Sequence, residues 1–214
     1  MKKFHEYDFV HDTQKAFRIM LESMANPGRV LSLSQMSAKL PMYRANLTVL
    51  GLVLLDNEVS FFSPDQTLSE SLSALTLSRP AGLRQADYIF LPLGHPIDME
   101  GAVLAAKKGT LGDPHASATF LIEVPTLDIH PDPNSDSCFN PEYDGYLYLY
   151  GPGIHEAANI PAPAAVREAV AYREKSCCRF PLGIDFFFID AKGSIMAIPR
   201  TTRLVSVDLV ERGA

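Results

Sequence analysis

The chain of 214 residues contains no tryptophan and only three cysteines, Cys138, Cys177 and Cys178. None has the Cys-x-x-Cys spacing of a zinc or redox motif, and two adjacent cysteines bridge each other only with strain. A disulfide-dense secreted scaffold is therefore excluded, and we expect reduced thiols in a cytoplasmic protein. The lysines at positions 2 and 3 precede no apolar segment, so we expect no signal peptide.

Long apolar runs and an excess of positive charge are also missing. The longest strongly apolar stretch, residues 47–55, is far shorter than the roughly 20 residues that span a bilayer. The net charge of −6 argues against binding along a nucleic-acid backbone, which needs a basic surface. We therefore expect neither a membrane nor a nucleic acid as a partner.

The composition is that of a globular protein, with 47% hydrophobic and 21% charged residues. Its length predicts a single domain, residues 1–214. The mean hydropathy of +0.03 is slightly apolar for a monomer of this size, which indicates that a partner covers some of its surface.

Motifs for the common catalytic chemistries are absent as well. None of the six histidines pairs with another at a metal-binding spacing, and we expect no metal site. The sequence has no Gly-x-Ser-x-Gly nucleophile motif and neither of the common glycine-rich phosphate loops. The catalytic residues, if the chain has any, stay unknown at this point.

Apolar periodicity and turn residues predict an alternation of helices and strands. Asp12 is the expected cap of the first helix, in which Phe17, Met20, Leu21 and Met24 follow helical spacing before a stop at residues 26–28. The other predicted helices cover residues 44–55, 67–77, 98–108 and 163–175. The predicted strands cover residues 29–33, 59–62, 88–91, 118–124, 146–150, 184–189, 194–198 and 204–209.

This order favours an α/β domain with a mixed sheet, in which crossovers join the early strands and antiparallel pairs form late in the chain. Nine of the thirteen residues 130–142 are Pro, Asp, Asn or Ser, so this segment reads as a loop. The hairpin near the C-terminus is predicted from the turn residues 190–193 between two strands of β-forming residues.

Gly151, Pro152 and Gly153 interrupt the chain directly after the predicted strand 146–150. Glycine lets two backbones approach closely, so a tight turn is one interpretation. The other is a backbone surface that meets a ligand or a partner.

Two arginines flank two hydroxyl side chains in Arg200, Thr201, Thr202 and Arg203. A guanidinium group offers a fork of donors to a phosphate or carboxylate, and a threonine adds a hydroxyl donor, so the four residues could bind an anion. They could equally form an internal salt bridge, for example to Asp185, or anchor an interface.

A pyridoxal phosphate enzyme needs a lysine in an enclosed pocket for its Schiff base. Lys107, Lys108 and Lys192 fall in predicted turns or at helix ends, where lysine side chains are solvated. We therefore expect no pyridoxal phosphate in this chain.

Several segments together resemble the PhnH family, the H subunit of the bacterial carbon–phosphorus lyase system, over residues 9–207. The resemblance is carried by Phe17-Arg18 with residues 24–28 (MANPG), Gly151-Pro152-Gly153-Ile154, residues 180–185 (FPLGID) and residues 198–202 (IPRTT). Residues 54–58 (LLDNE) also match, whereas the segment from His130 to Tyr143 is longer than is usual in the family.

The resemblance implies a role in the use of phosphonates as a phosphorus source. It implies a subunit that is non-catalytic or only indirectly catalytic and supports transfer of a phosphonate to the ribose C1 of ATP with loss of adenine. The alternative from the residues alone is a free-standing enzyme or anion-binding protein that clamps a phosphorylated or phosphonate ligand with Arg200 and Arg203.

The same resemblance implies a three-layer fold like the large domain of pyridoxal phosphate-dependent transferases, without the cofactor site. It also implies a homodimer that joins the G, I and J subunits in a core complex and works with the L subunit. Iron–sulfur chemistry would belong to the J subunit, and no cofactor to this chain.

Overall fold

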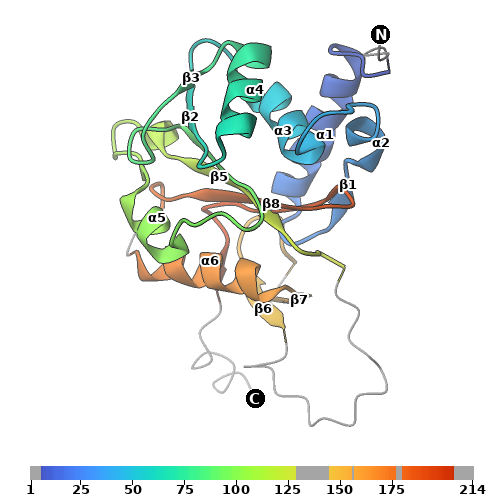
Figure 1. Ribbon diagram of the computed structural model, residues 1–214. Coiled ribbons are helices and arrows are strands. Elements are labelled where there is room, and N and C mark those ends of the chain that lie inside the picture. The colour runs from blue at the N-terminus through green and yellow to red at the C-terminus, as the bar shows by residue number, and fades with distance from the viewer. Residues whose placement is uncertain (1–5, 129–144, 156, 177–179, 205–214) are drawn as a thin grey trace, which may run out of the picture.

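The computed structural model describes residues 6–128, 145–155, 157–176 and 180–204 (Figure 1). Its helical segments are α1 (His11–Ala25), α2 (Ser34–Ser37), α3 (Ala45–Leu54), α4 (Gln66–Thr76), α5 (Met99–Ala105), the 3-10 turn η1 (Pro114–Ala116) and α6 (Ala164–Lys175). Its strands are β1 (Leu31–Ser32), β2 (Ser60–Phe62), β3 (Arg79–Pro80), β4 (Tyr88–Leu91), β5 (Thr119–Val124), β6 (Tyr146–Tyr150), β7 (Ala158–Pro161), β8 (Asp185–Asp190), β9 (Ser194–Ile198) and β10 (Arg203–Leu204).

A seven-stranded mixed sheet divides the protein, in the order β1-β9-β8-β5-β4-β2-β3. The pairs from β3 to β8 are parallel, and β9 pairs antiparallel with both β8 and β1. The predicted α/β class and mixed sheet are therefore confirmed, with crossovers early and an antiparallel hairpin late. A smaller antiparallel sheet has the order β10-β6-β7.

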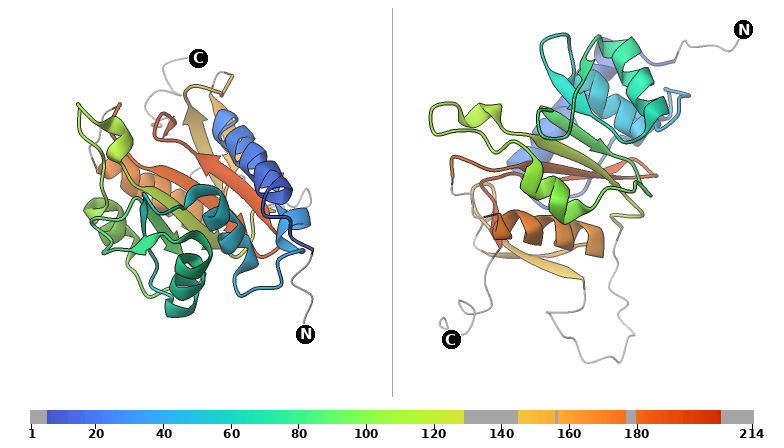
Figure 2. Two further views of the ribbon diagram at one scale, coloured as in Figure 1. Left: turned by 90° about the horizontal axis from the view of Figure 1, so that it is seen from above. Right: turned by 60° about the vertical axis from the view of Figure 1, so that its left-hand side comes forward.

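Helices cover both faces of the large sheet, which gives the fold three layers. Helices α1 to α4 lie on one face, and α5, α6 and the small sheet lie on the other; Figure 2 shows the same layers from two further directions. Successive side chains of β8 serve different layers: Phe186 and Phe188 belong to the core with α5 and α6, and Phe187 and Ile189 to the core with α1 to α4. Burial of both faces explains why β8 reads as an unbroken apolar run.

Several predicted elements are found close to their expected limits. Strands β4, β6 and β9 coincide with the predicted residues 88–91, 146–150 and 194–198. The long helices α3, α4 and α6 begin and end within a residue of prediction. Helix α5 ends at Ala105 rather than at residue 108, since Lys107 leaves the helix to pair with Asp87.

The prediction that Asp12 caps the first helix is wrong. Val10 is the N-cap residue, and Asp8 Oδ1 accepts hydrogen bonds from the amides of Val10 and His11, each at 2.9 Å. Asp12 is buried inside α1, where Lys39 Nζ donates to its Oδ1 at 2.8 Å. Asp12 therefore forms a long-range ion pair with Lys39, and Asp8 accepts the hydrogen bonds of the amides at the start of the helix.

The apolar residues of α1 are divided between two faces. Met20 is buried with the small residues Ala16 and Ser23, whereas Phe17 and Leu21 are 51% and 58% exposed. Helical spacing thus located the helix but did not identify its buried face.

Short elements escaped prediction because they carry too few residues for a periodic pattern. These are α2, β3, β7 and η1. Other predictions lie outside the described residues: the loop 130–143, the three cysteines and residues 205–209 of the last predicted strand. Among the helices that the structure describes, none combines the length and the apolar character needed to cross a membrane.

Candidate functional site

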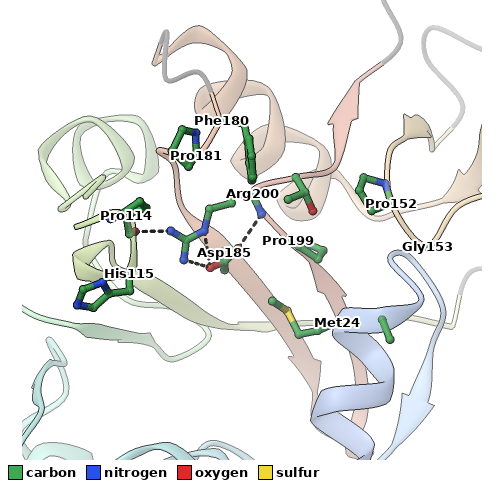
Figure 3. A pocket seen from close by; sticks show the side chains of 12 residues that line it. Met24, Pro114, His115, Pro152, Gly153, Phe180, Pro181, Asp185, Pro199 and Arg200 are labelled. Carbon is green, nitrogen blue, oxygen red and sulfur yellow. Dashed lines mark hydrogen bonds and ion pairs between the residues drawn. The ribbon is translucent and has the colours of Figure 1, made fainter. Parts of the chain in front are cut away.

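Residues from four motifs, at positions 24–28, 151–154, 180–185 and 198–202, meet at one pocket, which we call the amino-edge pocket (Figure 3). It lies where β8 begins at Asp185 and where η1 leads into β5, so it is at the amino ends of the parallel strands. Its volume is about 540 Å³. Its lining residues are Met24, Ala25, Pro114, His115, Pro152, Gly153, Phe180, Pro181, Asp185, Pro199, Arg200 and Thr201.

The turn after β6 packs directly against two other parts of this pocket. A Cβ atom on Gly153, where φ is +82°, would lie 2.3 Å from the carbonyl oxygen of Ala25. A Cβ on Gly151, where φ is +144°, would lie 2.8 Å from the carbonyl oxygen of Thr201. Both glycines are therefore required by close backbone approach. The turn after β6 therefore packs against both the end of α1 and the segment after β9.

Arg200 is held by the protein itself. Its amide donates to Asp185 Oδ1 at 2.7 Å, and its Nε donates to Asp185 Oδ2 at 3.0 Å. Nη2 donates to the same oxygen, and Nη1 donates to the carbonyl oxygen of Pro114 at 2.8 Å. The two side chains are mostly buried, so this is a charge-assisted pair in a sheltered position. The pair fastens η1 and β8 to the turn after β9.

The remaining residues of the predicted anion site do not converge on one point. Thr201 lines the pocket, whereas Thr202 is fully buried. Arg203 begins β10, and its Nη1 is 3.7 Å from Glu174 Oε2 on α6. The two arginines therefore face different carboxylates and do not form a clamp with a shared centre.

Arg173 is the residue that sequence reasoning missed. It is only 3% exposed, and its Nη1 donates to the carbonyl oxygens of Ile184, Ile198 and Pro199 at 3.0–3.1 Å. Its Nη2 donates to the carbonyl oxygen of Thr202 at 2.7 Å. Burial lowers the pKa of the guanidinium to about 10, which leaves it charged at neutral pH.

A signal for Arg173 was present in the sequence. It lies seven residues after Val166 and three after Val170, both buried, so it occupies a position of the apolar face of α6. A charged residue at such a position must be paired or hydrogen-bonded. Here it satisfies four backbone oxygens that the strands leave open.

No group of three or more His, Cys, Asp or Glu side chains suited to a metal ion occurs among the residues described. The lysines considered for a Schiff base have other contacts: Lys107 pairs with Asp87, and Lys192 Nζ lies 2.9 Å from Asp128 Oδ2. Lys108 Nζ donates to the carbonyl oxygen of Leu104 at 2.6 Å.

Comparison with known proteins gives one family and no curated relative. The family model for PhnH, described as a bacterial phosphonate metabolism protein, matches residues 5–205. A search of curated proteins gives no match. Because the match covers nearly the whole chain and every segment of the amino-edge pocket, the chain belongs to the PhnH family of bacterial phosphonate metabolism proteins.

Proposed function

We propose that this chain is a non-catalytic or indirectly catalytic subunit of the carbon–phosphorus lyase system. In this role it supports the transfer of a phosphonate to the ribose C1 of ATP, a step in which adenine leaves. The family match supports the pathway, since PhnH proteins act in phosphonate metabolism. The step itself follows from the sequence resemblance.

The contacts of Arg200 favour a supporting role for this chain over direct binding of an anion. An arginine that clamps a substrate needs donors directed at an open site, but each nitrogen of this guanidinium already donates to Asp185 or to Pro114. Arg203 lies near Glu174, whereas the carboxylate that pairs with Arg200 is that of Asp185. The observation favours a rigid, shaped pocket for a protein contact over the alternative of a free-standing enzyme that grips an anion with paired arginines.

The partners in this proposal are a second copy of the chain and the G, I and J subunits, with the L subunit in a functional role. The exposed face of α1 supports self-association, because Val10, Phe17 and Leu21 leave large apolar groups in water. Glu22 beside this face is already paired with Arg29 at 3.0 Å, so the support for self-association comes from the apolar groups. No bound cofactor is part of the proposal.

Co-purification with tagged G, I and J subunits tests the proposal, with Arg200→Ala as the first variant. We expect the variant to stay folded by circular dichroism and to lose at least about tenfold in affinity for the complex, since the amino-edge pocket loses its anchor. Complex assembly at unchanged affinity, with failure of phosphonate transfer alone, would favour the anion-clamp alternative. Turnover of ATP and methylphosphonate by the purified chain alone would overturn the supporting role.

Self-association has a separate variant, Phe17→Glu, which places a charge in the middle of the exposed face of α1. We expect it to shift the chain from dimer to monomer in analytical ultracentrifugation, because a charge in an apolar interface loses its hydration. Leu104→Glu on α5 is the matched control, as Leu104 is similarly exposed. A dimer unaffected by Phe17→Glu places the interface elsewhere.

A further inference from the structure

One buried side chain lies behind the amino-edge pocket and holds two of the segments that form it. Arg173 on α6 is 3% exposed and is not among the residues that line the pocket. Its two terminal nitrogens donate at 2.7–3.1 Å to backbone carbonyl oxygens on both segments, those of Ile184, Ile198, Pro199 and Thr202. Residues next to these carbonyl groups in the chain line the pocket (Figure 3).

Two peptide groups connect Arg173 to the pair formed by Arg200 and Asp185. The carbonyl of Ile184 shares a planar peptide group with the amide of Asp185. The carbonyl of Pro199 shares another with the amide of Arg200. This second group is bonded on both sides, since its carbonyl oxygen accepts from Arg173 at 3.0 Å and its amide donates to Asp185 Oδ1 at 2.7 Å. Arg173 therefore fixes the backbone from which both side chains of the pair extend.

The segment that follows β9 is fastened further along by the same guanidinium group. Its Nη2 donates to the carbonyl oxygen of Thr202, whose amide donates to the carbonyl oxygen of Pro199 at 2.9 Å. Thr201, directly before Thr202, lines the pocket, and its carbonyl oxygen lies against Gly151 in the turn after β6. The position of that turn therefore depends on the segment that Arg173 holds.

Arg173 also acts on the pocket through its charge. Burial lowers the pKa of its guanidinium group to about 10, while the negative charges of Glu174 and Asp185 act in the opposite direction. Asp185 therefore interacts with two charged arginines at neutral pH, with Arg200 by contact and with Arg173 at longer range. A lysine at position 173 would keep the charge, but its single nitrogen cannot present the planar fork that reaches four oxygens. Replacement by lysine therefore separates the charge of Arg173 from its hydrogen bonds.

We propose that Arg173 is the positioning residue of the amino-edge pocket. It does not touch the partner, but it sets where Arg200 and Asp185 lie, and through them it sets the affinity of the pocket for a protein partner. The partner in this inference rests on the proposed function, whereas the positioning of the pair concerns this chain alone. A side chain that only added stability would change the free energy of unfolding without moving the pair.

NMR of the full chain tests the positioning role through the Arg200 Nε–H group, whose signal is assigned by its loss in Arg200→Lys. We expect Arg173→Lys to speed exchange of this hydrogen with water at least about tenfold, because the bond from Nε to Asp185 at 3.0 Å opens more often. Arg173→Gln, with two donors and no charge, is expected to do the same. Asn46→Leu is the matched control, since Asn46 donates to two carbonyl oxygens at the other end of β8. An unchanged exchange rate in both Arg173 variants, or an equal increase in the control, overturns the assignment.

Affinity for the complex of G, I and J subunits tests the link to the partner. We expect Arg173→Lys to weaken this binding at least about tenfold, and Asn46→Leu to leave it unchanged. Because Arg173 acts through Arg200, the losses from Arg173→Lys and Arg200→Ala should not add in the double variant. Fully additive losses would contradict an action through the pair. If Arg200→Ala binds as tightly as the unsubstituted chain, the proposed function fails, and the exchange rate still decides the role of Arg173.

Discussion

The two edges of the large sheet are built in opposite ways. At the amino edge, polar side chains are consumed by the protein: Arg200 is paired with Asp185, and Arg173 satisfies four carbonyl oxygens. At the carboxyl edge, Arg44 is paired with Glu123, and Lys192 stays mostly exposed. Four of the segments that carry the family resemblance gather at the first edge, whereas ligands in open α/β sheets usually bind at the second. The contrast is one of burial: the Arg200–Asp185 pair is sheltered by the protein, whereas the Lys192–Asp128 pair lies at the surface.

The largest effect that we expect compares the side chains that hold each edge together. Arg173→Met leaves four buried carbonyl oxygens without their donor, and we expect a loss of roughly 3–5 kcal/mol in the free energy of unfolding. At the carboxyl edge, Asn46 Nδ2 donates to only two carbonyl oxygens, those of Asp190 and Ala191. We expect Asn46→Leu to cost about 1–3 kcal/mol. Urea unfolding measures both, and equal losses would contradict the view that the amino edge is the more tightly fastened.

The next comparison uses two glycines with the same backbone conformation. Gly153 at the amino edge has φ +82°, and Gly94 at the carboxyl edge has φ +81°. An added Cβ would meet a backbone oxygen at Gly153, but no heavy atom within 4 Å at Gly94. We expect Gly94→Ala to cost about 1–2 kcal/mol from the left-handed backbone alone. Gly153→Ala should cost a further 1–3 kcal/mol from crowding. If thermal unfolding shows the same cost for both, the close packing of the turn after β6 has no energetic weight.

The smallest expected effect is a pH dependence at the carboxyl edge. Burial lowers the pKa of His95 below its ordinary 6.5. The unfolded chain therefore takes up this proton first, and the free energy of unfolding falls as the pH drops below about 6.5. The histidine contribution is fully present above that value. We expect His95→Gln to flatten the slope between about pH 5 and 6.5, and the ring signal of His95 in NMR to titrate below 6.5. A midpoint above 6.5 would show that the ring is not sheltered.

Most strands could be predicted from the sequence, but the side chains that contact one another could not. The residues of β8 and β9 were predictable, because apolar runs between turn residues report burial directly. The exposure of Phe17 and Leu21 was not, since periodicity identifies a helix without saying which side finds a partner. In α1 the buried side is the one with the small residues, Ala16 and Ser23, which let the helix approach the sheet.

The candidate site was predictable only in part. The motif residues could be named one by one, and Asp185 could be suggested as a partner of an arginine. That residues from α1, the turn after β6, η1 and the segment after β9 share one pocket follows from the order of strands in the sheet, which no local pattern contains. The left-handed backbone of Arg44 gave no signal in the sequence, because the packing of the folded chain sets that conformation.

The position of β9 has a consequence for the growing chain on the ribosome. The residues of β1 are synthesised long before those of β9, its partner in the large sheet. Strand β5 likewise waits for β8. Until residues 185–198 have left the ribosome, β1 and β5 each lack a strand partner, and the amino-edge pocket lacks Asp185. The large sheet is therefore completed only after residues 185–198 have been synthesised, and its earlier strands are open to non-native pairing in the interval.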